Sequence, residues 1–277
     1  MDIQKTQPLI KKLIDHAQRS IYHPCNKKMT NTKKSILFDF ALVAMVIAAT
    51  FSNSGKIQAQ TAKKQLFVNE TRPCKAFHTI RVSTVVNVHF EPADHYGLEV
   101  HVMRNMLPNI RTEVQDSVLK IYCKDLDNNQ EKIDVYVWGV DIHTLILSGA
   151  VDFEHTGMLQ AECLNVTLSG ASEAQLHVDA KHVQLNLSGV SEVDLSGYVE
   201  HLDAMLSGNS ELDAKRLTID TMNVETSGTS EAEMGISKTA AFTASGISRI
   251  TYQGTPNIIR QQISRLSCIK NKHTHND

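Results

Sequence analysis

At intervals of about 20 residues, a Ser-Gly pair recurs six times in the second half of this 277-residue chain, and this repeat constrains the fold more than any other feature. The glycines follow one another at intervals of 21, 19, 19, 20 and 18 residues. They are Gly149, Gly170, Gly189, Gly208, Gly228 and Gly246. A degenerate seventh copy, Ile-Ser-Arg, lies at residues 263–265. A repeat of about 20 residues indicates a solenoid, in which each repeat forms one coil stacked on the previous one.

Apolar residues occupy alternate positions on both sides of each glycine. Two, four and six residues before Gly170 come Leu168, Val166 and Leu164, with polar residues between them. The same phase resumes four and six residues after each glycine, and a period of two is that of a strand with one buried face. By this register His143, six residues before Gly149, should point inward.

Each coil is therefore expected to contain two short strands separated by corners. One corner is the Ser-Gly pair, where glycine permits a positive φ without the steric cost of a Cβ atom. The second corner is more variable, as at residues 179–182 and 196–200. The predicted fold class is all-β, a single-stranded parallel β-helix or β-solenoid with coils of about 20 residues.

Alternation also predicts half-buried strands before the repeats, near residues 80–90, 98–102, 119–123 and 133–137. These are less evenly spaced than the later strands. We therefore divide the chain into an irregular N-terminal β region at 66–142, regular solenoid repeats at 143–271 and a tail at 272–277.

Residues 1–59 predict export. A basic lead-in precedes a 12-residue apolar run at 40–51. This run is shorter than the roughly 20 residues that span a bilayer, and it fits the core of a signal peptide. Ala59 is the preferred cleavage site, residues 60–65 form a linker, and Met29 is a candidate for the true start. The rival interpretation is an uncleaved signal, which would be the chain's one contact with the membrane.

Composition excludes several classes of function. The net charge is −2 and there is one Trp, so nothing indicates a nucleic-acid-binding surface. No cofactor motif is present, and no cofactor is expected. The cysteines after the signal show no zinc-ligand spacing, and their even number permits disulfides that cannot be assigned from sequence. They are Cys74, Cys123, Cys163 and Cys268.

Stacking would align outward carboxylates into rows about 4.8 Å apart. They lie three or five residues after the glycines, at Asp152, Glu173, Glu192, Glu211 and Glu231, and at Asp194, Asp213 and Glu233. Neighbouring charges at that spacing repel by roughly 1 kcal/mol even in bulk water. The favoured interpretation is a solvated acidic face with no metal, and the alternative is a strip that binds divalent cations. Arg249 is expected to end the first row against Glu231.

Serines two residues after the glycines form another row, as at Ser191, and are expected to hydrogen-bond neighbouring turns. No catalytic residue is predicted. Residues 170–174 lack the second glycine of a nucleophile elbow. Parallel β-helix enzymes that cleave polysaccharides use paired carboxylates, but Asp194 and Asp213 are explained equally well by the ladder.

Four features in order carry a resemblance to a known family. They are residues 77–83 (Phe-His-Thr-Ile-Arg-Val-Ser), residues 116–121 (Asp-Ser-Val-Leu-Lys-Ile), the Ser-Gly-x-Ser coils, and Gly-Thr-Pro at 254–256 leading to the last strand. Together they resemble the head GIN domain family of auto-transporter adhesins, exported β-solenoids of Bacteroidota. The resemblance covers about residues 66–271. It implies an envelope protein without established enzymatic activity and with an adhesive role.

The leading hypothesis is a non-enzymatic, exported cell-envelope protein, at the cell surface or in the periplasm, that binds a glycan or an envelope protein. The first alternative is a periplasmic interaction or regulatory module. The second alternative is a polysaccharide-active β-helix enzyme.

Overall fold

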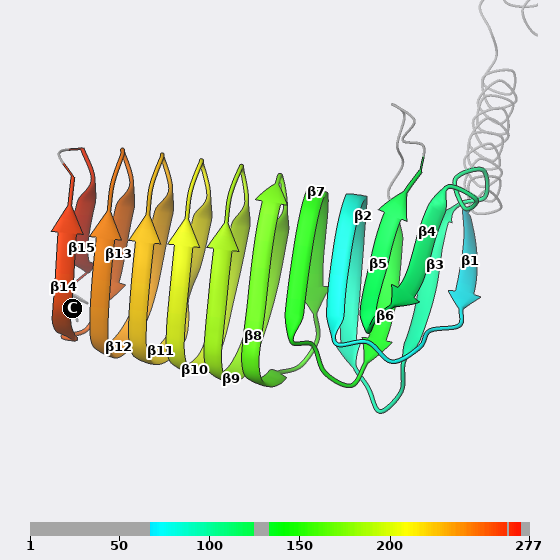
Figure 1. The fold of residues 1–277 in the computed structure, drawn as a ribbon, viewed down its shortest axis with the longest axis horizontal. Helices are drawn as coiled ribbons and strands as arrows, with labels where there is room; N and C mark the ends of the chain where they lie inside the picture. Colours follow the sequence, from blue (N-terminus) through cyan, green and yellow to red (C-terminus); the bar gives the residue numbers. More distant parts are fainter. Residues whose placement is uncertain (1–66, 125–132, 265, 273–277) are drawn as a thin grey trace, which may run out of the picture. The chain divides into compact units, whose positions relative to one another are not determined.

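The computed structural model describes residues 67–124, 133–264 and 266–272. Over these residues the chain forms fifteen strands in one continuous sheet that coils around an apolar core (Figure 1). No helix in this described part is long and apolar enough to cross a membrane. The predicted signal peptide, the Met29 start, the Ala59 cleavage site, Arg265 and the tail beyond Lys272 lie outside the described residues.

The N-terminal region combines antiparallel and parallel pairing. Its strands are β1 (Phe67–Arg72), β2 (Thr79–Pro92), β3 (Gly97–Met103), β4 (Ile110–Gln115), β5 (Val118–Cys123) and β6 (Asp134–Gly139). Strand β3 pairs antiparallel with β1 and β6, and β4 pairs antiparallel with β5. Strand β2 runs parallel to β5, β6 and β7, so it joins this region to the regular coils.

The regular coils are stacked in parallel, as the repeat predicts. Their strands are β7 (Thr144–His155), β8 (Leu159–Gly170), β9 (Glu173–Leu187), β10 (Glu192–Leu206), β11 (Glu211–Thr226), β12 (Glu231–Ala244), β13 (Arg249–Gln253), β14 (Asn257–Ile263) and β15 (Cys268–Lys272). Equivalent positions of successive coils pair directly, so that Glu173, Glu192 and Glu211 lie on adjacent strands. The all-β solenoid prediction is confirmed.

The second corner differs from the prediction. Strands β9 to β12 each run through it as one strand of 14 to 16 residues. In Figure 1 the Ser-Gly corners are thin loops on one edge, whereas continuous ribbon curves around the other edge. Backbone pairing persists through this bend. Strands β9 and β10 keep one register across it, as between Val199 and Ala180, whereas the pairing of β10 with β11 shifts register between Asp194 and Ser196, as at a β-bulge.

The inward rows are buried, as the alternation predicts. Leu164, Val166 and Leu168 are at most 1% exposed. His143 is an exception, because it lies just before β7 and is exposed. Ile142 is buried instead, and the imidazole of His143 stacks on that of His78 with ring centroids 5.4 Å apart.

Candidate functional site

The six corner glycines shape the backbone of the coils. All six have a positive φ. A Cβ atom on Gly189 would lie 2.6 Å from the carbonyl oxygen of Gly170 in the preceding coil. That oxygen accepts a hydrogen bond from the Val190 amide at 2.7 Å. Glycine is therefore required both by the left-handed backbone and by the close approach of two coils.

The serines at each corner are already hydrogen-bonded. Ser188, before Gly189, donates its hydroxyl to the Leu168 carbonyl of the preceding coil at 3.3 Å. Ser191, two residues after the same glycine, is buried and donates to the Ser188 carbonyl at 3.0 Å. We expected the serines of this row to bond neighbouring turns. The bond from Ser191 lies within one corner instead, whereas Ser230 and Ser248 bond within their corner and also approach a carbonyl of the preceding coil at 3.5 Å. These hydroxyls hold the corner together.

The carboxylates predicted to form rows do lie on adjacent strands, on an outward surface that we call the acidic face. The first row runs through Asp152, Glu173, Glu192, Glu211, Glu231 and Arg249, and the second through Glu154, Gln175, Asp194, Asp213, Glu233 and Thr251. The acidic face comprises these two rows on β7 to β13.

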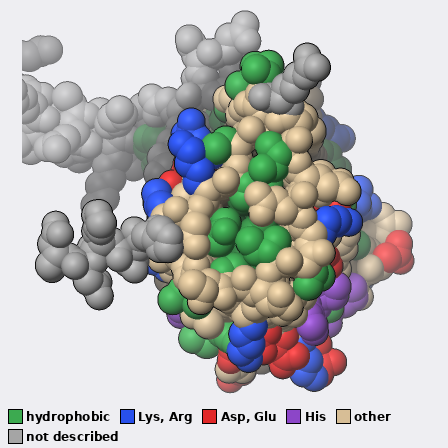
Figure 2. All heavy atoms as spheres, turned by 90° about the vertical axis from the view of Figure 1, so that its left-hand side faces the viewer, with side chains coloured by type: hydrophobic (Ala, Val, Ile, Leu, Met, Phe, Trp, Pro, Cys, Tyr) green, Lys and Arg blue, Asp and Glu red, His purple; other side chains and the backbone are tan. Residues whose placement is uncertain are grey.

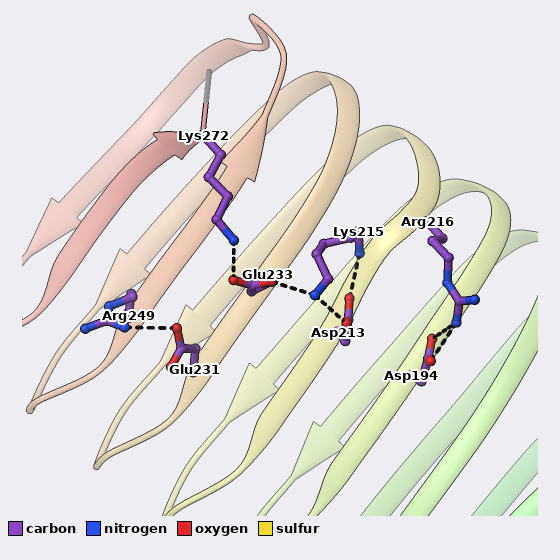
Figure 3. A network of polar contacts seen from close by, with 8 residues as sticks. All are labelled: Asp194, Asp213, Lys215, Arg216, Glu231, Glu233, Arg249 and Lys272. Atoms are coloured by element: carbon purple, nitrogen blue, oxygen red, sulfur yellow. Dashed lines mark hydrogen bonds and ion pairs between the residues drawn. The ribbon is translucent and has the colours of Figure 1, made fainter. Parts of the chain in front are cut away.

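The C-terminal half of the acidic face carries its own cations (Figure 3). Arg216 contacts both oxygens of Asp194, at 2.9 and 2.6 Å. Lys215 bridges Asp213 and Glu233, with each N–O distance 2.8 Å.

Two further cations complete this arrangement. Lys272 reaches Glu233 at 2.6 Å, and Arg249 contacts Glu231 at 3.2 Å, where we expected the row to end. Hydrogen bonds from Lys215 and Lys272 lower the pKa of Glu233. Much of the acidic charge in this half is therefore neutralised within the protein.

The middle of the acidic face is different. Glu173, Glu192 and Glu211 line a shallow hollow of about 230 Å³ beside the corner residues Val190 and Ser191. Desolvation raises the pKa of Glu192, and the charges of Glu211 and Glu173 raise it further. Within the described residues, no group of three or more His, Cys, Asp or Glu side chains is arranged to hold a metal ion. The hollow therefore collects mutually repelling charges and contains no built metal site.

Histidine and tyrosine extend the second row toward the N-terminus, which sequence reasoning missed. The ring of Tyr136 lies 4.8 Å from that of His89 and 4.6 Å from that of His101. His89 also approaches Asp134, with Nε2 3.4 Å from Oδ1. These residues come from β2, β3 and β6. Their proximity depends on non-local pairing, so only the order of strands in the sheet could have revealed it.

The strands that precede the Ser-Gly corners form a second outward surface, which we call the polar face. On β7, β8 and β9 its side chains carry no charge and are mainly hydroxyls and amides. Its three rows there are Thr144, Asn165 and Gln184; Ile146, Thr167 and Asn186; and Ser148 and Ser169, which Ser188 continues directly after the end of β9. The sequence pattern placed most of these residues outward, but it did not distinguish this face as a site.

A hollow of about 380 Å³, which we call the axial groove, crosses the polar face from β8 to β12. Its outward side chains are Thr167, Asn186, Met205, Glu225 and Thr243, and the corner residues beside them include Ser188, Ser207, Ser227 and Ser245. Met205 is 45% exposed. The Glu225 carboxylate accepts a hydrogen bond from Arg260 at 3.1 Å. The groove is thus open, elongated and close to neutral.

The thiols of Cys74, Cys163 and Cys268 are free, and Cys163 is exposed. None of these cysteines lines the acidic hollow or the axial groove. They therefore contribute nothing to either candidate surface.

Comparisons with known proteins agree with this architecture. Residues 76–256 match the sequence profile of the family described as "Putative auto-transporter adhesin, head GIN domain". No curated protein sequence gives a significant match.

Solved structures share the fold at low identity. A "putative adhesin" from Bacteroides fragilis NCTC 9343 superposes with a TM-score of 0.67 and 17% identity, over 74% of this chain and 97% of that one. Another from Parabacteroides distasonis ATCC 8503 gives 0.60 and 18%, over 74% and 96%. A "putative lipid binding protein" from the same organism gives 0.56 and 15%, over 74% and 96%. At these identities the likeness concerns the fold alone.

Proposed function

Because this chain belongs to the family of putative auto-transporter adhesins with a head GIN domain, we propose that it is a non-enzymatic binding module exported to the cell envelope. The observation that carries the proposal is the pair of outward faces, each of which presents aligned side chains across successive coils. Extended rows of this kind suit a long or repetitive ligand, because each coil can offer an equivalent contact.

The carboxylates argue against the enzyme alternative. A polysaccharide-cleaving site needs one carboxyl group as general acid and a second as base or nucleophile, both facing the substrate. Asp194 is bound on both oxygens by Arg216, and Asp213 is bound by Lys215. The hollow beside Glu192 is shallow and does not surround a substrate. The residues therefore support recognition better than bond cleavage.

The adhesive role and the periplasmic alternative differ in where the faces are displayed. We propose display at the cell surface. The test uses intact cells that express the full chain with an epitope tag after Asp277, treated with externally added protease. Loss of the tag, with a periplasmic marker intact, is expected. A tag protected until the outer membrane is permeabilised would overturn surface display and favour the periplasmic module.

Binding itself is tested with the purified chain on beads, offered extracellular-matrix proteins, envelope fractions and polysaccharides. Saturable capture of at least one of these is expected. A chain with a normal melting transition that captures none of them would refute the binding role.

A further inference from the structure

The arrangement and chemistry of the axial groove limit the class of ligand that it can bind. Equivalent positions of β8, β9, β10, β11 and β12 follow one another along it, one from each coil. A ligand lying in the groove would therefore run along the solenoid axis and meet a new side chain at each strand spacing, about 4.8 Å. Such a path suits an extended polymer better than a compact molecule.

The hydrogen-bonding groups along the groove fall into two sets. The hydroxyls of the corner serines are already hydrogen-bonded within the protein, because Ser188 and Ser207 each donate to a carbonyl of the preceding coil at 3.3 Å. Thr167, Asn186 and Thr243 make no side-chain hydrogen bond to any other residue that the structure describes. Two hydroxyls and one amide are thus left to bind a ligand, and each can both donate and accept.

The side chains that line the groove argue against a charged polymer and against a protein as its ligand. The one carboxylate among the outward side chains of the groove, Glu225, is paired with Arg260. No lysine or arginine lines the groove to attract an anionic chain. No aromatic side chain lines it either, and Met205 is its one large exposed apolar residue, so it lacks the aromatic anchors typical of protein interfaces.

From these observations, and resting on the binding role proposed above, we propose that the axial groove binds an uncharged polysaccharide along the solenoid axis. Thr167, Asn186 and Thr243 hydrogen-bond its hydroxyls, and Met205 packs against the apolar face of a sugar ring. The paired Glu225 carboxylate accepts from a further hydroxyl. Each coil contributes little, so affinity depends on the number of coils that one chain spans.

The test titrates the full chain with neutral polysaccharides (dextran, mannan and laminarin), with an anionic one (polygalacturonate) and with a cationic one (chitosan). Binding to at least one neutral polymer is expected. Its longer oligosaccharides should bind about tenfold or more tightly than its disaccharide. Binding confined to the charged polymers, or no dependence on length, would overturn the inference.

Variants locate the site. Met205→Arg places a bulky charge in the middle of the groove, and Asn186→Ala removes a free amide. Both side chains point outward, and unchanged melting temperatures would show that the fold is intact. Met205→Arg is expected to weaken binding by about tenfold or more, as for loss of well-packed contacts in a binding site. Met158→Arg is the matched control, because Met158 is 46% exposed and lines neither the acidic hollow nor the axial groove, and this variant should bind like the wild type.

The inference and the binding role can fail separately. Capture of a matrix or envelope protein that persists in Met205→Arg, without binding of any neutral polysaccharide, would overturn the polysaccharide inference and leave the binding role standing. Failure to capture anything in either assay would overturn both.

Discussion

The close approach of successive coils at the Ser-Gly corner can be tested by comparing two glycines with the same backbone angle. Gly189 and Gly157 both have a φ of +78°. A Cβ on Gly189 would lie 2.6 Å from the Gly170 carbonyl oxygen, whereas a Cβ on Gly157 would meet nothing within 4 Å. Gly157→Ala therefore measures the cost of the left-handed backbone alone. Gly189→Ala adds the steric conflict between coils.

The expected costs differ measurably. A left-handed residue with a Cβ costs about 1–2 kcal/mol, which both variants share. Forcing extra volume into a tightly packed site adds about 1–3 kcal/mol, which only Gly189→Ala incurs. For a chain of this size, that difference corresponds to a melting temperature lower by about 2–12 °C. Differential scanning calorimetry of the two variants and the wild type measures it. Equal melting temperatures for the two variants would refute the argument that coil contact demands glycine.

Three further predictions concern charge, metal and the corner serines. Glu192→Gln should raise the free energy of unfolding by up to about 1 kcal/mol at low salt, because it removes repulsion from Glu173 and Glu211. Since the folded pKa of Glu192 lies above its ordinary 4.5, wild-type protein takes up a proton and loses this repulsion on acidification. The difference in free energy of unfolding between the variant and the wild type, measured by urea titration, should therefore shrink in 1 M salt and as the pH falls toward 4.5. A difference that depends on neither salt nor pH would contradict the electrostatic cause. The melting temperature should not respond to EDTA or added calcium, and a calcium-dependent rise would restore the cation-strip interpretation. Ser191→Ala removes a buried hydrogen bond and should lower the free energy of unfolding, measured by chemical denaturation, by about 1 kcal/mol. Thr167→Ala, whose side chain points outward, should change it by less than about 0.5 kcal/mol. Equal effects would show that the corner hydroxyl is dispensable.

The regular coils follow from sequence because each inward row repeats the same local pattern. Leu168 and Leu187 occupy equivalent places, so a period of two together with a period near 20 defines both burial and register. The cluster of His89, Tyr136 and His101 could not be predicted, because it depends on antiparallel and parallel pairings between strands far apart in the chain.

The sequence also does not show which carboxylates are neutralised by cations or which hydroxyls are hydrogen-bonded within the protein. Neutralisation of the acidic rows depends on Lys215 and Arg216, which lie in the variable bend of one coil and not in any repeated position. The hydroxyls of the corner serines are hydrogen-bonded within the protein, whereas those of Thr167 and Thr243 bond to no other residue that the structure describes. This contrast arises from corner geometry, which residue type alone does not determine.

The hydrogen bonds that the serine before each corner glycine and the amide after it make between coils all run in one direction. In each coil the amide and hydroxyl of the serine, and the amide after the glycine, donate to carbonyls of the coil before it, as with Ser188 to Leu168 and Val190 to Gly170. A coil can therefore close its corner as soon as its predecessor is in place, without any residue that comes later in the chain. Folding can therefore proceed from the N-terminal region toward the C-terminus, in the order in which the chain leaves the ribosome. Each closed coil thus provides the template on which the next coil forms, so the solenoid can grow in one direction.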